Sequence, residues 1–556
     1  MKWVKNEMPM KVGEIVSRRT GMPRADLLND IKEYNINNMS DAVNLFIKHV
    51  KAKGKIGSFC DYDTDGINCA NGMKTLGKVI SYPIDVYVPK RFSDGYGIKS
   101  RHIKHYVEEG YNLLILCDNG IAANEAVSEA KANGIDVIIL DHHENRVDEA
   151  GNVILPDADV IVDPHVTGAD FEDYCGAGLV YCFSKKVLER CNYVVPAKKR
   201  AALKKICTFA AIGTIGDVVS LTGENRRIVK DGLKNIMENG ATTGMNALMK
   251  KMYLSDYITS VDVGFTVSPS FNAAGRLEDA GSSFVSDVTS YDGLSADSMN
   301  NKIEKIIELN KKRKKLSKER FSAMDAYIAE HELDKSNFIV LVDNEGTIGI
   351  NGLTAGKITE KYNVPSIVFS PISDDLIKGS GRAPEWANLK AILDKNNPLI
   401  EAYGGHPEAC GITLNKKNID AFRKAVQKTT PQPPHTEQNT TLSYDIECGV
   451  KDVPLVTDAV NIFGPYGQDN PEIVVRVDNI PLQIGVNGSY EFFMGENKQH
   501  LKLSCRYFDI LWFDGSEQYK AMGSPREISV VGTVGLNVYK GKAKVQVMAI
   551  DVKPAE

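Results

Sequence analysis

The stretch that decides the fold is KIGSFCDYDTDG, residues 55–66, in which a short apolar run ends in three alternate aspartates, Asp61, Asp63 and Asp65. The apolar run predicts a buried strand, and Gly66 allows a tight turn directly after the acidic residues. Carboxylates this close together raise one another's pKa and destabilise a fold unless a cation neutralises them. Because hard divalent cations prefer oxygen ligands, the stretch predicts a metal site at the end of a strand.

Two further apolar runs end in the same way, NLLILC at residues 112–117 and DVIIL at residues 136–140. Acids or imidazoles follow them: Asp118 after the first run, and Asp141, His142 and His143 after the second. In open α/β sheets, ligands bind beyond the carboxyl ends of the strands. At any one strand end a turn or helix-cap role is an equal alternative. Three such ends with adjacent histidines favour metal binding.

Length and composition set broad limits on the protein. A chain of 556 residues predicts three or more domains, and 43% hydrophobic with 25% charged residues is ordinary for a globular protein. The net charge of -5 neither indicates nor excludes a nucleic-acid partner, because a polyanion responds to the local field. The ten cysteines are scattered without a CxxC pair, which argues against a zinc knuckle or a disulfide framework.

Targeting signals are not evident in the sequence. The N-terminal residues lack the apolar core of a secretory signal. No stretch approaches the ~18 consecutive apolar residues that a membrane span requires. We therefore expect a protein without membrane association, located in the cytoplasm.

The order of expected elements predicts an α/β protein made of several segments. Frequent turns among β-branched and aromatic residues near the C-terminus predict a small β-barrel, with an OB-fold as the leading candidate. The expected segments are a helical lead-in (1–54), an α/β domain with the acidic strand ends (55–290), a long charged connecting helix (291–334), a second α/β unit (335–428), a proline-rich linker (429–441) and the β-rich domain (442–556).

Polar side chains beside glycines are candidates for ligand contacts. Residues 86–97 predict a strand followed by a glycine-rich loop with Lys90 and Arg91, where cations suit phosphate contact and a solvated surface turn is the alternative. Ser380 and Arg382 lie in IKGSGRAPEW, and His406 follows two glycines. Glycine allows a ligand to approach the backbone closely, so these residues are candidates for substrate binding.

The motifs DYDTDG, CDNG, DHHE, GTIGDVVSL, NAAGRL and GGHPEACG occur in this order, and with them the chain resembles the DHH phosphoesterase family over nearly its whole length. The resemblance implies a two-lobed core, in which a parallel-sheet DHH domain precedes a smaller α/β DHH-associated domain with the GGH motif. It places the sequence GPYGQDNPE, residues 464–472, in the OB-like domain that follows.

The same resemblance implies a site for two divalent cations, Mn²⁺ or Mg²⁺, with Asp118 as the bridging carboxylate. The implied metal ligands are Asp63, Asp65, Asp118, His142 and Asp217. Asp61, Asp141 and His143 complete the implied catalytic set as supporting or substrate-facing groups. The implied phosphate and strand-end contacts are Arg91, Arg276, Ser380, Arg382 and His406. The chain departs from the family at Asp163-Pro164-His165, where an Asn-Pro pair is expected.

The activity that the resemblance implies is a metal-dependent 5′-to-3′ exonuclease, which hydrolyses single-stranded DNA to 5′-mononucleotides in DNA repair and recombination. The expected partners are single-stranded DNA and, beyond it, a single-strand-binding protein or a helicase, and we expect a monomer. One alternative is a DHH phosphoesterase for short oligoribonucleotides or cyclic dinucleotides, against which the C-terminal segment counts. A non-catalytic DHH-like scaffold is the other, and the intact acidic residues count against it.

Overall fold

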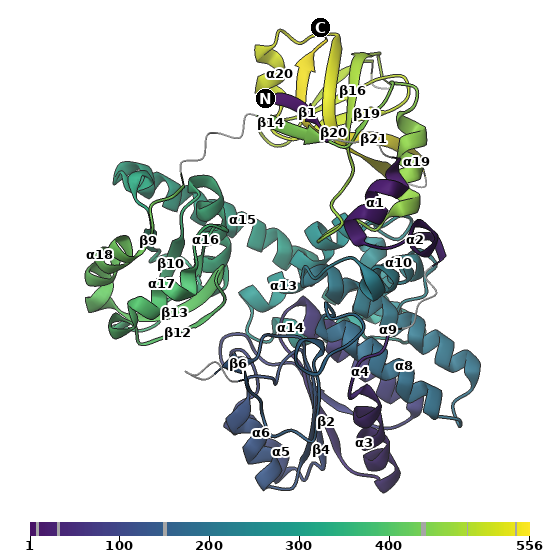
Figure 1. The fold of residues 1–556 in the computed structure, drawn as a ribbon, viewed down its shortest axis with the longest axis vertical. Coiled ribbons are helices and arrows are strands. Elements are labelled where there is room, and N and C mark those ends of the chain that lie inside the picture. Colours follow the sequence, from purple (N-terminus) through teal and green to yellow (C-terminus); the bar gives the residue numbers. More distant parts are fainter. Residues whose placement is uncertain are drawn as a thin grey trace. The chain divides into compact units, whose positions relative to one another are not determined.

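The structure, a computed structural model, forms two compact units, each described here by itself (Figure 1). The first unit contains Met1–Pro269, Ser282–Ile303 and Asn439–Glu556, and the second contains Ser270–Gly281 and Glu304–Gln438. The described residues are 1–6, 11–29, 34–147, 153–434, 441–485, 488–539 and 542–555. Residues 30–33 of the expected lead-in and 435–440 of the expected linker therefore lie outside the described part.

The first unit contains a five-stranded sheet in which all neighbouring strands are parallel. Its order is β3 (Asp85–Tyr87), β2 (Ile56–Phe59), β4 (Leu113–Cys117), β5 (Asp136–Leu140) and β8 (Val160–Val162). The three central strands are apolar and buried, as expected for a parallel sheet covered on both faces. Phe59 pairs with Leu116, and Cys117 with Leu140, so the three predicted strands end at the same edge.

Helices cover both faces of this sheet (Figure 1). Apolar side chains of α5 (Ser100–Glu108) and α6 (Asn124–Ala132) share one core with alternate residues of β4 and β5. The helices associated with the opposite face are α3 (Met39–Ala52), α4 (Thr64–Ile80), α8 (Gly176–Arg190) and α9 (Pro196–Gly216). Beyond them follow α10 (Gly223–Met237), α11 (Thr243–Lys251), α12 (Ser260–Asp262), a π-helix (Val263–Val267), α13 (Ser268–Leu277) and α14 (Gly281–Thr289).

The second unit contains its own mixed sheet and the long charged helix. The helix α15 (Asn300–Glu330) lies within the expected connecting segment, residues 291–334, and begins nine residues after its expected start. The sheet has the order β12 (Ala402–Gly405), β13 (Ala409–Asn415), β11 (Leu376–Arg382), β10 (Ser366–Pro371) and β9 (Ile339–Val342), of which only β9 and β10 are parallel. Its helices include α16 (Ile348–Tyr362), α17 (Leu389–Lys395) and α18 (Ile419–Thr429). Phe338, Phe369 and Phe422 are buried in its core.

The C-terminal domain is rich in strands, as predicted. Its seven-stranded sheet has the order β15 (Ile446–Glu447), β16 (Val474–Pro481), β20 (Glu527–Tyr539), β21 (Lys542–Pro554), β19 (Asp509–Trp512), β18 (His500–Ser504) and β17 (Glu491–Met494). The sheet is mixed, since β15 and β16, and β19 and β21, are parallel. An isolated bridge between Leu482 and Cys505 joins the ends of β16 and β18. Closure of the sheet into a barrel stays a prediction.

The N-terminal residues differ from the expected helical lead-in. Their first element, β1 (Lys2–Lys5), is a strand that pairs in parallel with β14 (Thr441–Tyr444). The helices α1 (Val12–Thr20) and α2 (Arg24–Asn29) follow, and their apolar residues lie in the core of the C-terminal domain. Apolar spacing shows that a segment buries one face, but the partner depends on tertiary packing. In the described part of the chain, no helix has the length and apolar character needed to cross a membrane.

Candidate metal centre

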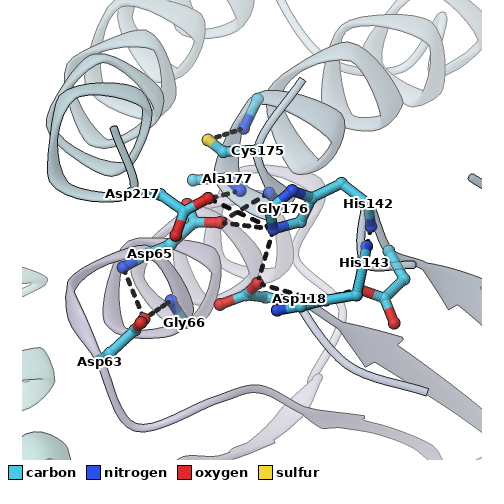
Figure 2. Close-up of polar contacts among 12 residues, drawn as sticks. Asp63, Asp65, Gly66, Asp118, His142, His143, Cys175, Gly176, Ala177 and Asp217 are labelled. Carbon is cyan, nitrogen blue, oxygen red and sulfur yellow. Dashed lines mark hydrogen bonds and ion pairs between the residues drawn. The ribbon is translucent and has the colours of Figure 1, made fainter. Parts of the chain in front are cut away.

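Carboxylates from separate elements converge on one imidazole at the carboxyl edge of the parallel sheet (Figure 2). The Nε2 atom of His142 lies 3.2 Å from Oδ1 of Asp118, 3.5 Å from Oδ2 of Asp217 and 3.8 Å from Oδ2 of Asp65. Asp118 follows β4, His142 follows β5, Asp65 lies in the first turn of α4, and Asp217 follows α9. The structure thus brings together residues that the sequence places in four separate segments.

Three overlapping groups of side chains have ligand atoms within 4.8 Å of one another. They are Asp118 with His142 and His143, Asp65 with His142 and Asp217, and Asp61 with Asp63 and Asp118. Asp118 and His142 each belong to two of the groups. Asp118 is thus shared by two groups that could hold a cation, and its role as the bridging carboxylate stays a prediction.

Helix ends hold two of these carboxylates in place. Oδ1 of Asp63 accepts hydrogen bonds from the backbone N–H groups of Asp65 (2.9 Å) and Gly66 (3.2 Å), and so caps α4. The carboxylate of Asp65 accepts from the N–H groups of Gly176 (2.6 Å) and Ala177 (3.0 Å) at the start of α8. The partial positive charge of a helix N-terminus stabilises a carboxylate. For Asp63 the cap and the metal-ligand interpretations are therefore compatible.

Two glycines, which the sequence analysis missed, give the carboxylates room. A Cβ atom on Gly176 would lie 2.6 Å from Cβ of Asp118, and one on Gly213 would lie 2.4 Å from Oδ1 of Asp65. Glycine destabilises a helix interior by roughly 1 kcal/mol relative to alanine, so its presence in α9 was an available signal of close packing. Asn119 was also missed, and its amide donates to the carbonyls of Phe59 and Cys117 at the ends of β2 and β4.

The crowding of buried acids shifts their protonation. Burial raises the pKa of Asp65 to about 6 and that of Asp217 to about 8, and neighbouring aspartates add to both shifts. Burial and neighbouring carboxylates also hold the pKa values of Asp61 and Asp118 well above the ordinary range. Burial and the charge of His143 lower the pKa of His142 to about 3, which leaves the neutral imidazole that ligates metals.

Asp141 lies behind the cluster and orients its histidines. Its carboxylate accepts hydrogen bonds from the backbone N–H groups of Ile121 (2.9 Å) and His142 (2.9 Å), and Oδ1 lies 2.7 Å from Nδ1 of His143. Burial lowers the pKa of His143, but the charge of Asp141 outweighs it and brings the pKa to about 10. Burial raises the pKa of Asp141, and His143 reverses this to about 2. The two residues therefore form an ion pair.

The donor set fits hard divalent cations. It consists of carboxylate oxygens and imidazole nitrogens, which are ligands that Mn²⁺ and Mg²⁺ accept. Oδ1 of Asp61 is buried and has no hydrogen-bond partner among the described residues. A buried carboxylate oxygen without a partner is unfavourable unless a cation binds it.

Arg91 lies beside this cluster, as the sequence analysis expected of a substrate contact. Its guanidinium carbon is 4.2 Å from the ring centroid of Tyr62, which separates Asp61 from Asp63. Within the residues that the structure describes, the buried Nε of Arg91 has no hydrogen-bond partner. Contact between Arg91 and a phosphate remains a prediction.

The other four predicted substrate contacts belong to the second unit. Arg276 donates to the carbonyl of Gly349 (3.1 Å), and Arg382 donates to Oγ of Ser380 (3.3 Å). A Cβ atom on Gly352 would lie 2.9 Å from Oγ of Ser380, so these three side chains gather around the first turns of α16. The remaining residue, His406, is exposed between β12 and β13. Their contact with a substrate remains a prediction.

Asp163, at the position where the chain departs from the expected Asn-Pro pair, has a local structural role. Oδ1 of Asp163 accepts from the backbone N–H of His165 (3.0 Å) and caps the short helix α7 (Pro164–Thr167). Asp163 is fully buried, and burial followed by the charge of Asp141 raises its pKa to about 7. His165 itself is exposed and lies outside the three ligand groups.

Family models match three parts of the chain in order: the DHH family, N-terminal domain, at residues 55–214, the DHHA1 domain at 335–430, and the RecJ OB domain at 444–551. Two curated relatives are single-stranded-DNA-specific exonucleases RecJ. The protein from Bacillus subtilis is 28% identical over 94% of this chain and 64% of its own length. The protein from Haemophilus influenzae is 25% identical over 95% of this chain and 92% of its own length.

A solved structure shows the same fold. The crystal structure of RecJ in complex with Mn²⁺ from Thermus thermophilus superimposes with a TM-score of 0.77 at 22% identity, over 98% of this chain and 76% of the other. The two structures therefore share a fold, and the family models match domains in the order that the sequence analysis expected. The chain thus matches the models of the DHH family's N-terminal domain, the DHHA1 domain and the RecJ OB domain in this order, and over most of its length it is similar to RecJ exonucleases.

Proposed function

We propose that the protein is a metal-dependent exonuclease, which hydrolyses phosphodiester bonds of single-stranded DNA from the 5′ end and releases 5′-mononucleotides. The observation that carries the proposal is the convergence of Asp65, Asp118 and Asp217 on His142. Relatives that match more than nine tenths of this chain are named single-stranded-DNA-specific exonucleases, which supports the substrate class.

Five residues would hold two divalent cations, Mn²⁺ or Mg²⁺, in this proposal: Asp63, Asp65, Asp118, His142 and Asp217. When bound, a pair of cations would supply a water of lowered pKa and would stabilise the charge on the entering and leaving oxygens. Asp141 orients His143, whose positive charge would attract a phosphate, and Arg91 would clamp a second phosphate with its planar guanidinium.

One face of the C-terminal sheet has side chains that suit the binding of single-stranded DNA. Register pairs Phe492 with Lys502, and His500 lies two residues earlier on the same face of β18. The ring of Phe513, in the turn after β19, lies 5.0 Å from the His500 ring, centroid to centroid. Phe492 is 51% exposed and Phe513 is 54% exposed. Exposed aromatic rings beside a basic side chain allow bases to stack while the cation contacts the backbone. We propose this face, named here the aromatic face and defined by Phe492, Lys502 and Phe513, as a contact for single-stranded DNA.

The cellular role, the protein partners, the oligomeric state and the location are part of the same proposal. The resemblance to RecJ supports a role in DNA repair and recombination, with a single-strand-binding protein or a helicase as a further partner. A monomeric state and a cytoplasmic location are also proposed. The absence of a membrane-spanning helix in the described part of the chain is compatible with that location.

The test compares substrates in the presence of Mn²⁺. Single-stranded DNA, duplex DNA, short RNA and cyclic dinucleotides are offered to the full chain, and the products are identified. We expect a 5′ label on single-stranded DNA to appear first as a mononucleotide, while a 3′ label stays on shortening strands. Faster hydrolysis of short RNA or cyclic dinucleotides would instead favour the small-substrate phosphoesterase. Metal binding without hydrolysis of any substrate would favour the non-catalytic scaffold.

A further inference from the structure

Arg226, on α10, is fully buried and binds a segment of the C-terminal domain. Its guanidinium donates hydrogen bonds to the carbonyl oxygens of Phe463 (2.9 Å), Gly464 (2.7 Å) and Pro465 (3.2 Å). An arginine remains charged when it is buried, so a set of carbonyl acceptors offsets the loss of its hydration. We name residues 463–470 the docking segment; it includes most of the sequence GPYGQDNPE.

The docking segment also contacts the chain that follows α9. The backbone N–H of Leu221 donates to the carbonyl of Gln468 (2.9 Å). A Cβ atom on Gly467 would lie 2.6 Å from Cδ1 of Leu221, so the glycine permits this close approach. The hydroxyl of Ser260 donates to the carbonyl of Tyr466 (2.6 Å). The docking segment is thus anchored four residues from Asp217.

The turn between Asp217 and Leu221 contains a strained residue. Val218 has φ of +59° and is 65% exposed. For a β-branched residue the left-handed region is an outlier, because Cβ approaches the backbone too closely. Such a conformation persists only when surrounding contacts enforce it. After Val218 the chain is held at Ser220, whose carbonyl accepts a hydrogen bond from the Asn225 side chain (2.9 Å), and at Leu221, which the docking segment holds.

We propose that the docking segment, held by Arg226, is a positioning element for the metal ligand Asp217. By fixing Leu221 it holds the turn at Val218 in the left-handed conformation that directs the Asp217 carboxylate toward His142. Release of the segment would let Val218 relax and would turn the carboxylate away. The C-terminal domain is thereby coupled to the metal centre. The inference rests on the proposed function, which makes Asp217 a metal ligand, and Arg226 acts here as a positioning residue.

The experiment measures Mn²⁺ affinity of the full chain by calorimetry, so that its readout does not depend on activity. Arg226→Met keeps a long side chain but removes the donors to the three carbonyls. We expect about tenfold weaker binding at one of two Mn²⁺ sites, as is typical when a residue that orients a ligand is lost. In parallel, kcat on single-stranded DNA should fall while KM changes little. The control is Tyr519→Phe, which removes a buried hydroxyl donor to Pro525 elsewhere in the same domain.

A second substitution separates positioning from a general structural effect. Asparagine adopts the left-handed conformation far more readily than valine does. Val218→Asn in the Arg226→Met background should therefore restore most of the Mn²⁺ affinity, although it restores no contact to the docking segment. A merely structural defect would not respond to this change.

If Arg226→Met fails to fold, Ser260→Ala tests the same idea through the loss of one hydrogen bond, and we expect a smaller shift in the same direction. A folded variant of either kind that binds Mn²⁺ as the wild type does, with two sites of unchanged affinity, would overturn the coupling and leave the proposed function intact. A wild-type protein that binds no Mn²⁺ would overturn both.

Discussion

The backbone N–H of Gly176 donates a 2.6 Å hydrogen bond to Oδ2 of Asp65, so the first residue of α8 lies directly against a carboxylate of α4. No side chain separates the helix end from the acidic cluster at this point, because residue 176 has none. The helix N-terminus therefore contributes its partial positive charge to a group of carboxylates that repel one another. This contact depends on the backbone of one helix and the side chain of another, which sequence patterns do not relate.

Gly176→Ala is expected to disturb the metal centre. The new Cβ would lie 2.6 Å from Cβ of Asp118 and 3.0 Å from Oδ2 of Asp65, so both carboxylates must shift. We expect Mn²⁺ affinity to fall about 10- to 100-fold, as for other losses of ligand orientation. Calorimetric titration with Mn²⁺ measures the change. Gly178→Ala on the same helix is the control, because its Cβ would meet Tyr174 at an ordinary 3.4 Å. Equal affinities for both variants would contradict this account.

Asp118→Asn is expected to abolish hydrolysis without unfolding the protein. Asp118 has φ of 61°, a conformation that asparagine tolerates better than alanine. Loss of a shared carboxylate should reduce the rate at least about 100-fold, beyond the usual effect of a residue that only orients a ligand. The metal-free variant should melt at or above the wild-type temperature, because one of the crowded buried acids is gone. Asp287→Asn, at an exposed pair with Lys74, is the control.

Asp509 is expected to make the C-terminal domain sensitive to acid. Its carboxylate lies 2.5 Å from Nζ of Lys544 and 2.9 Å from Nζ of Lys502. Burial raises its pKa, but the two lysines outweigh burial, and the net shift is downward. The stabilisation is therefore complete above the unfolded pKa of about 3.9 and is lost as the pH falls through the lower folded value.

The variant Asp509→Asn tests this direction of the pH dependence of stability. It should lower the free energy of unfolding by about 1 to 3 kcal/mol at pH 7, the range for hydrogen bonds to charged groups. The difference from wild type should shrink below about pH 4, where the unfolded wild-type residue takes up its proton. Unfolding curves between pH 7 and pH 3 measure it. Asp514→Asn, at a position whose side chain is 79% exposed, should change little at any pH.

The aromatic face is expected to bind long strands. Replacing both Phe492 and Phe513 by alanine removes the two exposed rings of this face. We expect binding of long single-stranded DNA to weaken by about 1 to 3 kcal/mol for each base that no longer stacks. Hydrolysis of a trinucleotide should change little. Fluorescence anisotropy with labelled strands measures binding, and Leu455→Ala, at another exposed apolar position of the domain, is the control. Equal loss on long and short substrates would reject the assignment.

Much of the candidate metal centre could be predicted because strand ends in a parallel sheet share one edge. Apolar runs before Asp61, Asp118 and Asp141 identified the strands, and the shared edge follows from parallel pairing. Asp217 could not be found in this way, because a single aspartate after a helix has the pattern of an ordinary cap. Its assignment as a ligand came from the resemblance, and the 3.5 Å distance to His142 gives it a physical basis.

By itself the sequence determined the strands, their acidic ends, the long charged helix and the β-rich C-terminal domain, since periodicity and turn residues act over a few neighbouring positions. Tertiary structure alone decided that β1 pairs with β14, that α8 supports Asp65, and that Arg226 binds the docking segment. These contacts join residues far apart in the chain. They depend on which surfaces pack together, and local patterns of polarity and propensity do not predict those packing partners.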